Sequence, residues 1–561
     1  MTGSDALLDA LVAQGVEVIF GNPGSTELPL MDSLARPGAP EFVLGLTEPA
    51  VMGMADGYAQ STGRLGVVLV HVQPGIANAM SGVLNAARAR VPLLVIVGQQ
   101  LSSMLPGAPF LGGEVADIAR PLARYSREVR TPADLGAMLR DAVAAALGPP
   151  AGPAILSVPL ETQAGPARRL PGLPVAPSGP APPDLAALDA AAALLAAARE
   201  PVVLAGDGVA HAHGEAVLAR LAARLGAPVM SEPFASRLVV GTDDPMWAGP
   251  MPRFAAGIRQ ALEPHDVVLA IGMPVFRLFG WSPGSALPDA VRLIHVDADP
   301  DEIGRSHRPD IGMVADPAMA MDGLLARMGA PDDPAGARHD RVAAALLTAR
   351  VNEHAALAAR ASGDGVITGA VLSRALGEAV APDDLVVDEG ITATRDLRVA
   401  LGDRAPGSVL WHRGSALGWG LPAAVGAALA QPSRRVVCAQ GDGSLMFGVH
   451  ALWTAAHHRA RVAMVVADNS GYEILRAGME GLTGRPEGGW PGLAVTDPDL
   501  DIAAICRGFG ASAEHVDDPG ALDDAMRDLL GRADAGPAVL VVRVGGRTPP
   551  VGGPLDGATA G

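Results

Sequence analysis

The sequence predicts an α/β fold made of three doubly wound parallel-sheet domains. Short, continuously apolar runs rich in Val alternate with Ala- and Leu-rich helical stretches, a pattern typical of parallel strands covered by helices on both faces. Two segments dense in Pro and Gly, 163–184 and 328–340, have the composition of linkers. They divide a chain of 561 residues, too long for one core, into pieces of ordinary domain size.

The predicted domains cover residues 1–165, 185–328 and 342–547, and residues 548–561 are expected to form a disordered tail. Each domain is expected to contain several short strands of the buried, parallel type. The predicted strands are 16–21, 66–72 and 92–98 in the first domain; 201–206, 266–272 and 291–297 in the second; and 384–390, 434–441, 462–468 and 538–544 in the third.

The composition excludes several classes of function. A net charge of −18 argues against a nucleic-acid partner, because phosphate contacts need clustered basic side chains. The sequence contains no lysine, which excludes Schiff-base chemistry and a standard P-loop. Two cysteines do not make a disulfide framework and suit a reducing compartment. No secretory signal is visible, and apolar runs such as 91–97 are too short to span a bilayer, so we expect a cytoplasmic protein with no membrane partner.

Polar residues follow two predicted strands of the third domain. Gly441-Asp442-Gly443 ends one strand, and Asp468-Asn469 ends the next, with the Asn 27 residues after the first Asp. The carboxyl ends of parallel strands share one edge, where ligands bind. A carboxylate, an amide oxygen and a backbone carbonyl suit Mg²⁺, which completes its coordination with phosphate oxygens. A helix expected at about 449–458, with its N-terminus beside Ser444, would supply N–H groups for those phosphates. The pattern predicts a metal and diphosphate clamp.

A second Gly-Asp-Gly occurs at 206–208. The residue 27 positions after Asp207 is Phe234, so this copy lacks the Asn partner. We interpret it as a turn at the end of a strand.

The third-domain pattern resembles the signature of thiamine diphosphate (ThDP) enzymes, although Asp468 stands where members often have Asn. The resemblance implies pyrimidine-binding, middle and diphosphate-binding domains in that order. It implies that Asp442, Asn469 and the carbonyl of Gly471 hold Mg²⁺. Cofactor contacts are implied for Asn22, Pro23, Gly24, Glu48, Thr392, Ser415, Leu417, Gly441, Gly443, Ser444 and Tyr472.

Two further segments resemble cofactor-activating parts of the family. In 44–64, Glu48 stands where a carboxyl group activates the aminopyrimidine ring; taken alone, it could be an acid at a helix start. In 414–429, Leu417 stands where an apolar side chain wedges the cofactor into a bent conformation, although core packing is an alternative role. The family brings the glutamate of one subunit to the clamp of another, which implies at least a homodimer and commonly a homotetramer.

Within the family, the chain is most similar to benzoylformate decarboxylases, through segments 20–34, 71–100, 265–277 and 441–456. This resemblance implies non-oxidative decarboxylation of a 2-oxo acid to an aldehyde and CO₂. It implies catalytic roles for three residues. These are Glu48, Ser25, which would bind the substrate carboxylate, and His71, which would act as an acid or base.

The substrate pocket departs from those relatives. Phe279 stands at the place of their second active-site histidine, and His412 is a candidate for its role as proton donor. Ile474 is bulkier and Gly478 smaller than an aromatic-substrate pocket suggests. An aliphatic or differently shaped 2-oxo acid is therefore considered beside benzoylformate.

Two other functions remain open at this point. The first is a ThDP-dependent carboligase or aldehyde lyase. The acetolactate synthase type uses an active-site lysine, which this chain lacks. The absence of lysine does not argue against a benzaldehyde lyase type. The second is a nucleotide-binding regulatory protein, because Asp297 and Asp299 follow a middle-domain strand where ribose-binding acids occur. No GxGxxG motif precedes them, and FAD is not expected. His457-His458 is interpreted as surface.

Overall fold

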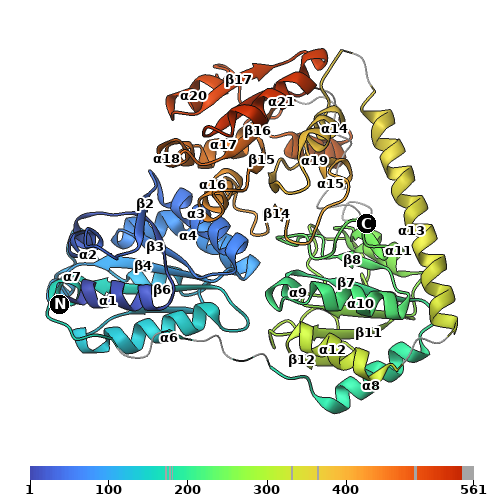
Figure 1. The fold of residues 1–561 in the computed structure, drawn as a ribbon, viewed down its shortest axis with the longest axis horizontal. Coiled ribbons are helices and arrows are strands. Elements are labelled where there is room, and N and C mark those ends of the chain that lie inside the picture. Colours follow the sequence, from blue (N-terminus) through green and yellow to red (C-terminus); the bar gives the residue numbers. More distant parts are fainter. Residues whose placement is uncertain are drawn as a thin grey trace.

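The computed structural model describes residues 1–170, 174–175, 179, 181–329, 333–362, 365–485 and 489–545. It confirms the predicted fold class: three six-stranded parallel sheets, each flanked by helices (Figure 1). Every predicted strand overlaps an observed one. The expected tail, 548–561, lies outside the described residues.

The sheet of the first domain has the strand order β2-β1-β3-β4-β6-β5. Its strands are β1 (Val18–Asn22), β2 (Glu41–Leu44), β3 (Gly66–Val70), β4 (Leu93–Gln99), β5 (Tyr125–Glu128) and β6 (Pro153–Pro159). Its helices are α1 (Gly3–Ala13), α2 (Leu28–Leu34), α3 (Glu48–Thr62), α4 (Val72–Ala89), α5 (Val115–Ala119), α6 (Leu135–Leu147) and α7 (Leu160–Ala164).

The sheet of the second domain has the order β12-β11-β10-β7-β8-β9. Its strands are β7 (Pro201–Ala205), β8 (Val229–Ser231), β9 (Trp247–Pro250), β10 (Val267–Ile271), β11 (Arg292–Asp297) and β12 (Ile311–Val314). Its helices are α8 (Leu185–Ala197), α9 (Asp207–His211), α10 (Glu215–Leu225), α11 (Ala255–Leu262) and α12 (Pro317–Arg327). The long helix α13 (Asp333–Arg360) then runs along one side of the molecule towards the third sheet (Figure 1).

The sheet of the third domain has the order β14-β13-β15-β16-β18-β17. Its strands are β13 (Leu385–Glu389), β14 (Val409–Trp411), β15 (Val436–Gly441), β16 (Val462–Asp468), β17 (Ser512–Val516) and β18 (Ala538–Arg543). Its helices are α14 (Gly369–Ala379), α15 (Leu397–Ala400), α16 (Gly420–Ala430), α17 (Asp442–Gly448), α18 (Ala451–His458), α19 (Glu473–Thr483), α20 (Ile502–Gly508) and α21 (Leu522–Arg532).

One helix differs from its predicted position. A single helix was expected at about 449–458, but helical structure begins at Asp442 itself, as the short α17, and continues as α18. Gly441 has an extended backbone and directly precedes the first helical residue. The chain therefore turns from strand into helix at the Gly-Asp-Gly motif, with no intervening loop.

The first and third domains pack through α3 and α16, which meet at small residues. A Cβ atom added to Gly57 would lie 2.0 Å from the carbonyl oxygen of Ala423, and one added to Gly426 would lie 1.8 Å from that of Met54. The two backbones are therefore in direct contact. Next to this crossing, Trp419 Nε1 donates a hydrogen bond to the buried Asp56 Oδ1 at 3.0 Å.

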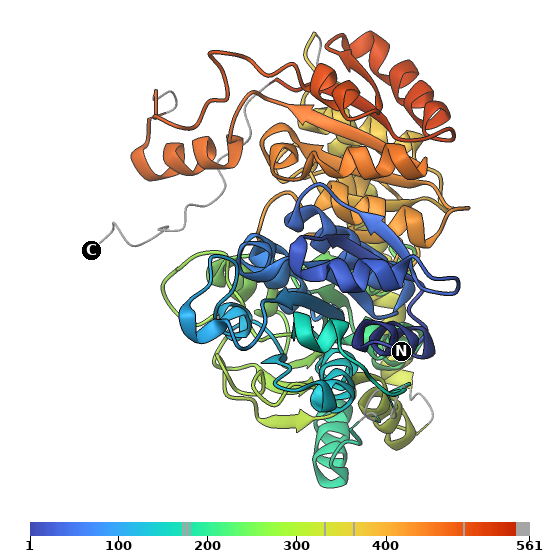
Figure 2. The same ribbon diagram turned by 90° about the vertical axis from the view of Figure 1, so that its left-hand side faces the viewer.

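Helix α19 projects from the third domain, away from the body of that domain (orange in Figure 2). Ala477 is its one buried residue among those described, and Leu475 and Leu482 are each 49% exposed. Within the described residues, no helix combines the length and the apolar character needed to cross a bilayer.

Candidate active site

The two ends of the third-domain motif lie in contact. β15 and β16 are paired in parallel, with Gly441 opposite Ala467, so both strands end at the same edge of the sheet. Asp442 Oδ2 accepts hydrogen bonds from the backbone N–H of Asn469 at 3.1 Å and of Gly471 at 3.3 Å. Its Oδ1 accepts one from the N–H of Gly443 at 2.7 Å. The carboxylate thus holds the loop that follows β16.

The donor set at this edge fits a magnesium ion. Asn469 Oδ1 is buried and has no hydrogen-bond partner among the described residues, which is costly unless a ligand meets it. Burial and the nearby Asp468 raise the pKa of Asp442 from 3.8 to about 6. A bound cation would lower this pKa again. Within the described part of the chain, no three His, Cys, Asp or Glu residues gather as metal ligands. A metal here would use one carboxylate, one amide and one backbone carbonyl.

The predicted clamp lines a cavity of about 710 Å³, which we call the main cavity. Gly443 is needed there, because a Cβ atom at this position would lie 2.8 Å from Cε1 of Tyr472. Predicted residues of several separate segments line this one cavity: Phe279, Thr392, His412, Ser415, Leu417, Gly441, Asp442, Gly443, Ser444, Asn469, Gly471, Tyr472 and Ile474.

Gly478 does not line the main cavity. A Cβ atom added to it would meet no other atom within 4 Å, so the small size of this residue leaves open space on α19.

The predicted residues of the first domain gather at a different place, the carboxyl edge of their own sheet. Asn22 ends β1 and donates from Nδ2 to the carbonyl of Gly45 at 2.8 Å. A Cβ atom on Gly24 would lie 2.3 Å from the ring of His71, so that loop and the histidine are in close contact. Glu48 is the first residue of α3, and its Oε2 accepts a hydrogen bond from Asn78 at 3.2 Å.

Within one chain, these two groups of predicted residues do not share a cavity. Asn22, Pro23, Gly24, Ser25, Glu48 and His71 are absent from the described residues that line the main cavity. The single chain therefore presents two separate groups of predicted site residues, each at the carboxyl edge of its own sheet.

Sequence reasoning missed Glu27. Its side chain is fully buried, and its Oε2 lies 2.9 Å from Nδ1 of His71 and accepts a hydrogen bond from the N–H of Gly24 at 2.7 Å. A buried carboxylate at Nδ1 fixes the ring and favours a proton on that nitrogen, which leaves Nε2 for other partners. Its position two residues after Ser25 was the available signal.

Glu389 was also missed. It is buried at the end of β13, and its two carboxyl oxygens accept hydrogen bonds from the N–H groups of Gly418, at 2.8 Å, and Gly420, at 2.5 Å. It thereby fixes the turn that carries Leu417. Burial raises the pKa of Glu389 from 4.5 to about 8.

His412 lies in the main cavity, but one of its nitrogens is already engaged. Nε2 is 3.0 Å from the carbonyl oxygen of Ala416, and burial lowers the pKa of His412 to about 4. The ring is therefore neutral near pH 7. Phe279, the residue in place of the expected histidine, packs instead in an aromatic group with Phe234 and Phe254, at centroid distances of 6.5 and 5.7 Å.

Two middle-domain features have structural roles. Asp207, in the second Gly-Asp-Gly copy, begins α9, and its Oδ2 pairs with Arg413 at 2.6 Å. Asp297 is fully buried and pairs with Arg90 of the first domain at 2.9 Å, and Asp299 lies 3.5 Å from the same guanidinium. The acids considered for ribose binding thus join two domains.

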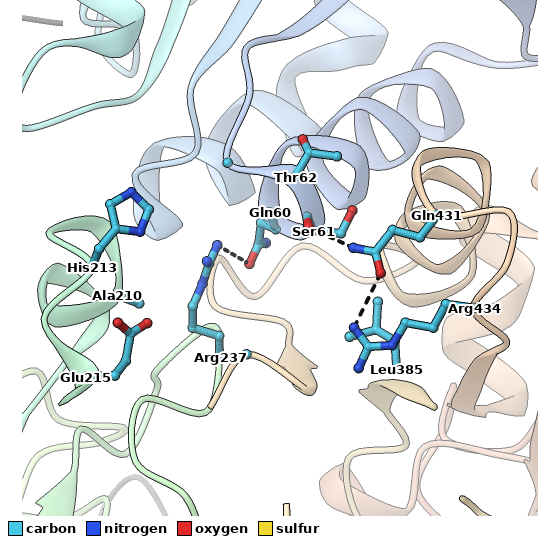
Figure 3. A pocket seen from close by; sticks show the side chains of 12 residues that line it. Gln60, Ser61, Thr62, Ala210, His213, Glu215, Arg237, Leu385, Gln431 and Arg434 are labelled. Atoms are coloured by element: carbon cyan, nitrogen blue, oxygen red, sulfur yellow. Dashed lines mark hydrogen bonds between the residues drawn. The ribbon is translucent and has the colours of Figure 1, made fainter. Parts of the chain in front are cut away.

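A smaller cavity of about 250 Å³ lies where all three domains meet (Figure 3). Among its lining residues, Arg237 donates a hydrogen bond to Gln60 Oε1 at 3.3 Å, and Arg434 approaches from the third domain. It contains none of the predicted site residues. His457 and His458 line neither cavity; His457 is exposed and stacks on Trp453.

Comparison with known families shows which family the chain belongs to. The N-terminal TPP binding domain of thiamine pyrophosphate enzymes matches residues 1–115, their central domain matches 188–324, and their C-terminal TPP binding domain matches 398–542. The chain belongs to the thiamine pyrophosphate enzyme family. Thiamine pyrophosphate is the same cofactor as ThDP, and the resemblance drawn from the motifs is confirmed.

Within this thiamine pyrophosphate enzyme family, relatives match over nearly the full chain. Benzoylformate decarboxylase of Pseudomonas aeruginosa is 34% identical over 94% of this chain and 96% of its own. The acetolactate synthase large subunit of Parasynechococcus marenigrum is 28% identical over 92% and 84%. Among solved structures, a ThDP-dependent 4-hydroxybenzoylformate decarboxylase of Rhodococcus jostii has a TM-score of 0.85 at 30% identity and covers 97% of this chain and 99% of its own.

Proposed function

We propose that the protein catalyses ThDP- and Mg²⁺-dependent, non-oxidative decarboxylation of a 2-oxo acid to an aldehyde and CO₂. The observation that carries this proposal is the oxygen set of Asp442, Asn469 and Gly471 at the rim of the main cavity, in which the buried Asn469 Oδ1 lacks a partner. Full-length similarity to a benzoylformate decarboxylase supports the reaction class.

When bound, ThDP would supply the nucleophilic carbon and accept the electron pair released as CO₂ leaves. The residues of this chain place and activate it. Asp442, Asn469 and the carbonyl of Gly471 would hold Mg²⁺ against the diphosphate. Glu389 holds the turn on which Leu417 would support the cofactor.

The first-domain residues handle substrate and protons in this proposal. Ser25 would bind the carboxylate of the 2-oxo acid. His71, with Nδ1 held by Glu27 at 2.9 Å, would present Nε2 to the oxygen of the former keto group and move its proton. Glu48 would hydrogen-bond the aminopyrimidine ring and so promote loss of the proton from the reactive carbon.

A second copy of the chain is part of the proposal. Glu48, Ser25 and His71 lie away from the main cavity of their own chain, so a complete site needs the first domain of one subunit against the third domain of another. The largely unburied α19 beside the cavity, on which Leu475 and Leu482 are each 49% exposed, supports such an assembly. We propose at least a homodimer and, by the resemblance, a homotetramer. A cytoplasmic location is consistent with the free, buried Cys438 and Cys506.

The test is release of CO₂ and aldehyde from a panel of 2-oxo acids, benzoylformate included, by protein loaded with ThDP and Mg²⁺. A Glu48→Gln variant should lose most of this activity and still bind Mg²⁺ and the diphosphate. Cofactor-dependent turnover that collapses in the variant is the expected result. Bound ThDP without CO₂ from any acid would overturn the proposal.

The second candidate is a carboligase or aldehyde lyase, favoured by the similarity to an acetolactate synthase subunit. Product analysis with an added acceptor aldehyde distinguishes the two activities, because ligation consumes the acceptor and yields a 2-hydroxy ketone.

A further inference from the structure

Three arginines line the main cavity: Arg253, Arg395 and Arg398. Arg253 lies between β9 and α11 of the second domain, and the other two follow β13 of the third. None of the three forms an ion pair with any residue that the structure describes. The chain has a net charge of −18, so a group of arginines without ion pairs in one cavity is unexpected. Such a group favours the binding of an anion.

The three guanidinium groups act on one another. Burial, followed by the positive charge of Arg395, lowers the pKa of Arg253. Burial lowers the pKa of Arg398 to about 10, with Asp388 opposing this effect and Arg253 adding to it. Like charges gathered in a partly desolvated space cost free energy, and a bound anion would offset that cost.

The acidic side chains of the main cavity are engaged with other groups. Asp388 accepts hydrogen bonds from the N–H of Gly390 at 3.0 Å and from Thr394 Oγ1 at 2.7 Å. Glu389 is bound to backbone amides of the Leu417 turn. Asp442 holds the loop after β16. Glu473, at the start of α19, lies 3.6 Å from Arg476.

Arg398 lies on the side of β13 away from the proposed diphosphate clamp. The strand order places β13 between β14 and β15, and the clamp follows β15 and β16. Arg398 stacks at 3.8 Å on the ring of Trp411, the last residue of β14. The guanidinium carbon of Arg253 lies 5.7 Å from the ring centre of Phe234, which stacks on Phe279. The positive charge therefore borders the predicted substrate pocket.

From this arrangement we infer that the substrate carries a second anionic group, such as a carboxylate at the end remote from the 2-oxo acid. Arg253 and Arg395 bind that group, Arg398 adds positive potential behind them, and the rings of Phe234 and Phe279 flank the intervening carbon chain. This inference rests on the proposed function, since it names the substrate class of the same site. Guanidinium groups bind carboxylates through two parallel hydrogen bonds and favour them over uncharged groups.

The test compares pairs of 2-oxo acids in which one member carries a second carboxylate and the other does not. 2-Oxoglutarate is set against 2-oxopentanoate, and 4-carboxybenzoylformate against benzoylformate. The loaded holoenzyme should show a kcat/KM at least tenfold higher for the charged member of at least one pair. Arg395→Gln and Arg253→Gln should each reduce that ratio at least tenfold, mainly through KM. Arg220→Gln, on an exposed face of the second domain, should leave the ratio unchanged.

A binding measurement separates this inference from the proposed function. Calorimetry with loaded protein should give tighter binding of glutarate than of pentanoate, by tenfold or more, and Arg395→Gln should abolish the difference. If no 2-oxo acid is turned over but glutarate is preferred, the decarboxylase proposal fails and the anion site stands. If neutral acids are decarboxylated, and the ratios of kcat/KM and of binding affinity between charged and neutral acids are both near one, the decarboxylase proposal stands and only this inference fails. Arginine variants that weaken ThDP binding without changing the ratios would assign the cluster to the cofactor and also overturn it.

Discussion

Asp442 Oδ2 accepts a hydrogen bond at 3.1 Å from the backbone N–H of Asn469, a residue 27 positions later in the chain. The residues that the motif singles out by spacing are thus direct neighbours in the structure. The same carboxylate accepts a hydrogen bond from the N–H of Gly471, so the side chain of one proposed metal ligand also shapes the loop that carries the other two proposed ligands.

Replacing Asp442 by Asn should weaken Mg²⁺-dependent binding of ThDP. The substitution removes the only negative charge among the three proposed ligands, and hard cations depend on such a charge. We expect the affinity for ThDP, measured by calorimetry with Mg²⁺ present, to fall at least tenfold, or by about 1.4 kcal/mol. Asp468→Asn is the matched control, because Asp468 pairs with Arg543 at 3.0 Å and lies outside the proposed ligand set. Equal affinities in both variants would contradict the metal assignment.

Replacing Glu27 by Gln should slow turnover with little change in KM. The amide can keep a hydrogen bond to His71, but it no longer favours a proton on Nδ1. We expect kcat to fall by about ten- to a hundredfold, less than the full contribution of a positioned acid or base, because His71 itself remains. Nitrogen NMR of the histidine ring should show the changed tautomer, a signal that a merely structural role would not produce. An unchanged spectrum with unchanged kcat would remove Glu27 from the site.

Replacing Asp56 by Asn should stabilise the protein above pH 6. Burial raises the pKa of Asp56 from 3.8 to about 6, so between these values the folded protein keeps a proton that the unfolded chain has lost. The free energy of unfolding therefore falls as the pH rises through this window, by about 3 kcal/mol in all for a shift of this size. Asn lacks this ionisation and can still accept from Trp419 Nε1. Thermal unfolding from pH 4 to 8 should show a flatter profile in the variant, and parallel profiles would refute this account.

Replacing Gly57 by Ala should strongly destabilise the protein. The new methyl group would lie 2.0 Å from a backbone carbonyl of α16, so the two domains would have to separate, at a cost of about 1–3 kcal/mol or more. Gly478→Ala is the matched control on a helix with open space. Alanine there should stabilise the helix by about 0.5–1 kcal/mol. Chemical denaturation of both variants measures the difference in the free energy of unfolding. Similar stabilities would mean that α3 and α16 can shift apart at little cost.

The comparison of strands shows what local sequence can reveal. The sequence pattern predicted none of the six strands at a sheet edge, which are β2, β5, β9, β12, β14 and β17. It also missed the interior strands β6 and β8. Interior strands such as β3 and β4 are buried on both faces and appear as unbroken apolar runs. Edge strands have one partner and tolerate polar residues: β17 reads Ser-Ala-Glu-His-Val.

The fold class, the family and the contact between Asp442 and Asn469 could be predicted from the sequence. Those features depend on continuous strands and on short spacings, since residues that end neighbouring parallel strands must meet at one edge. The tertiary structure alone decided what depends on distant segments. It buried Glu27 against His71, brought Arg253 of the second domain beside Arg395 of the third, and left Glu48 outside the main cavity of its own chain. Such contacts arise from the packing of whole domains, whose relative placement no local pattern encodes.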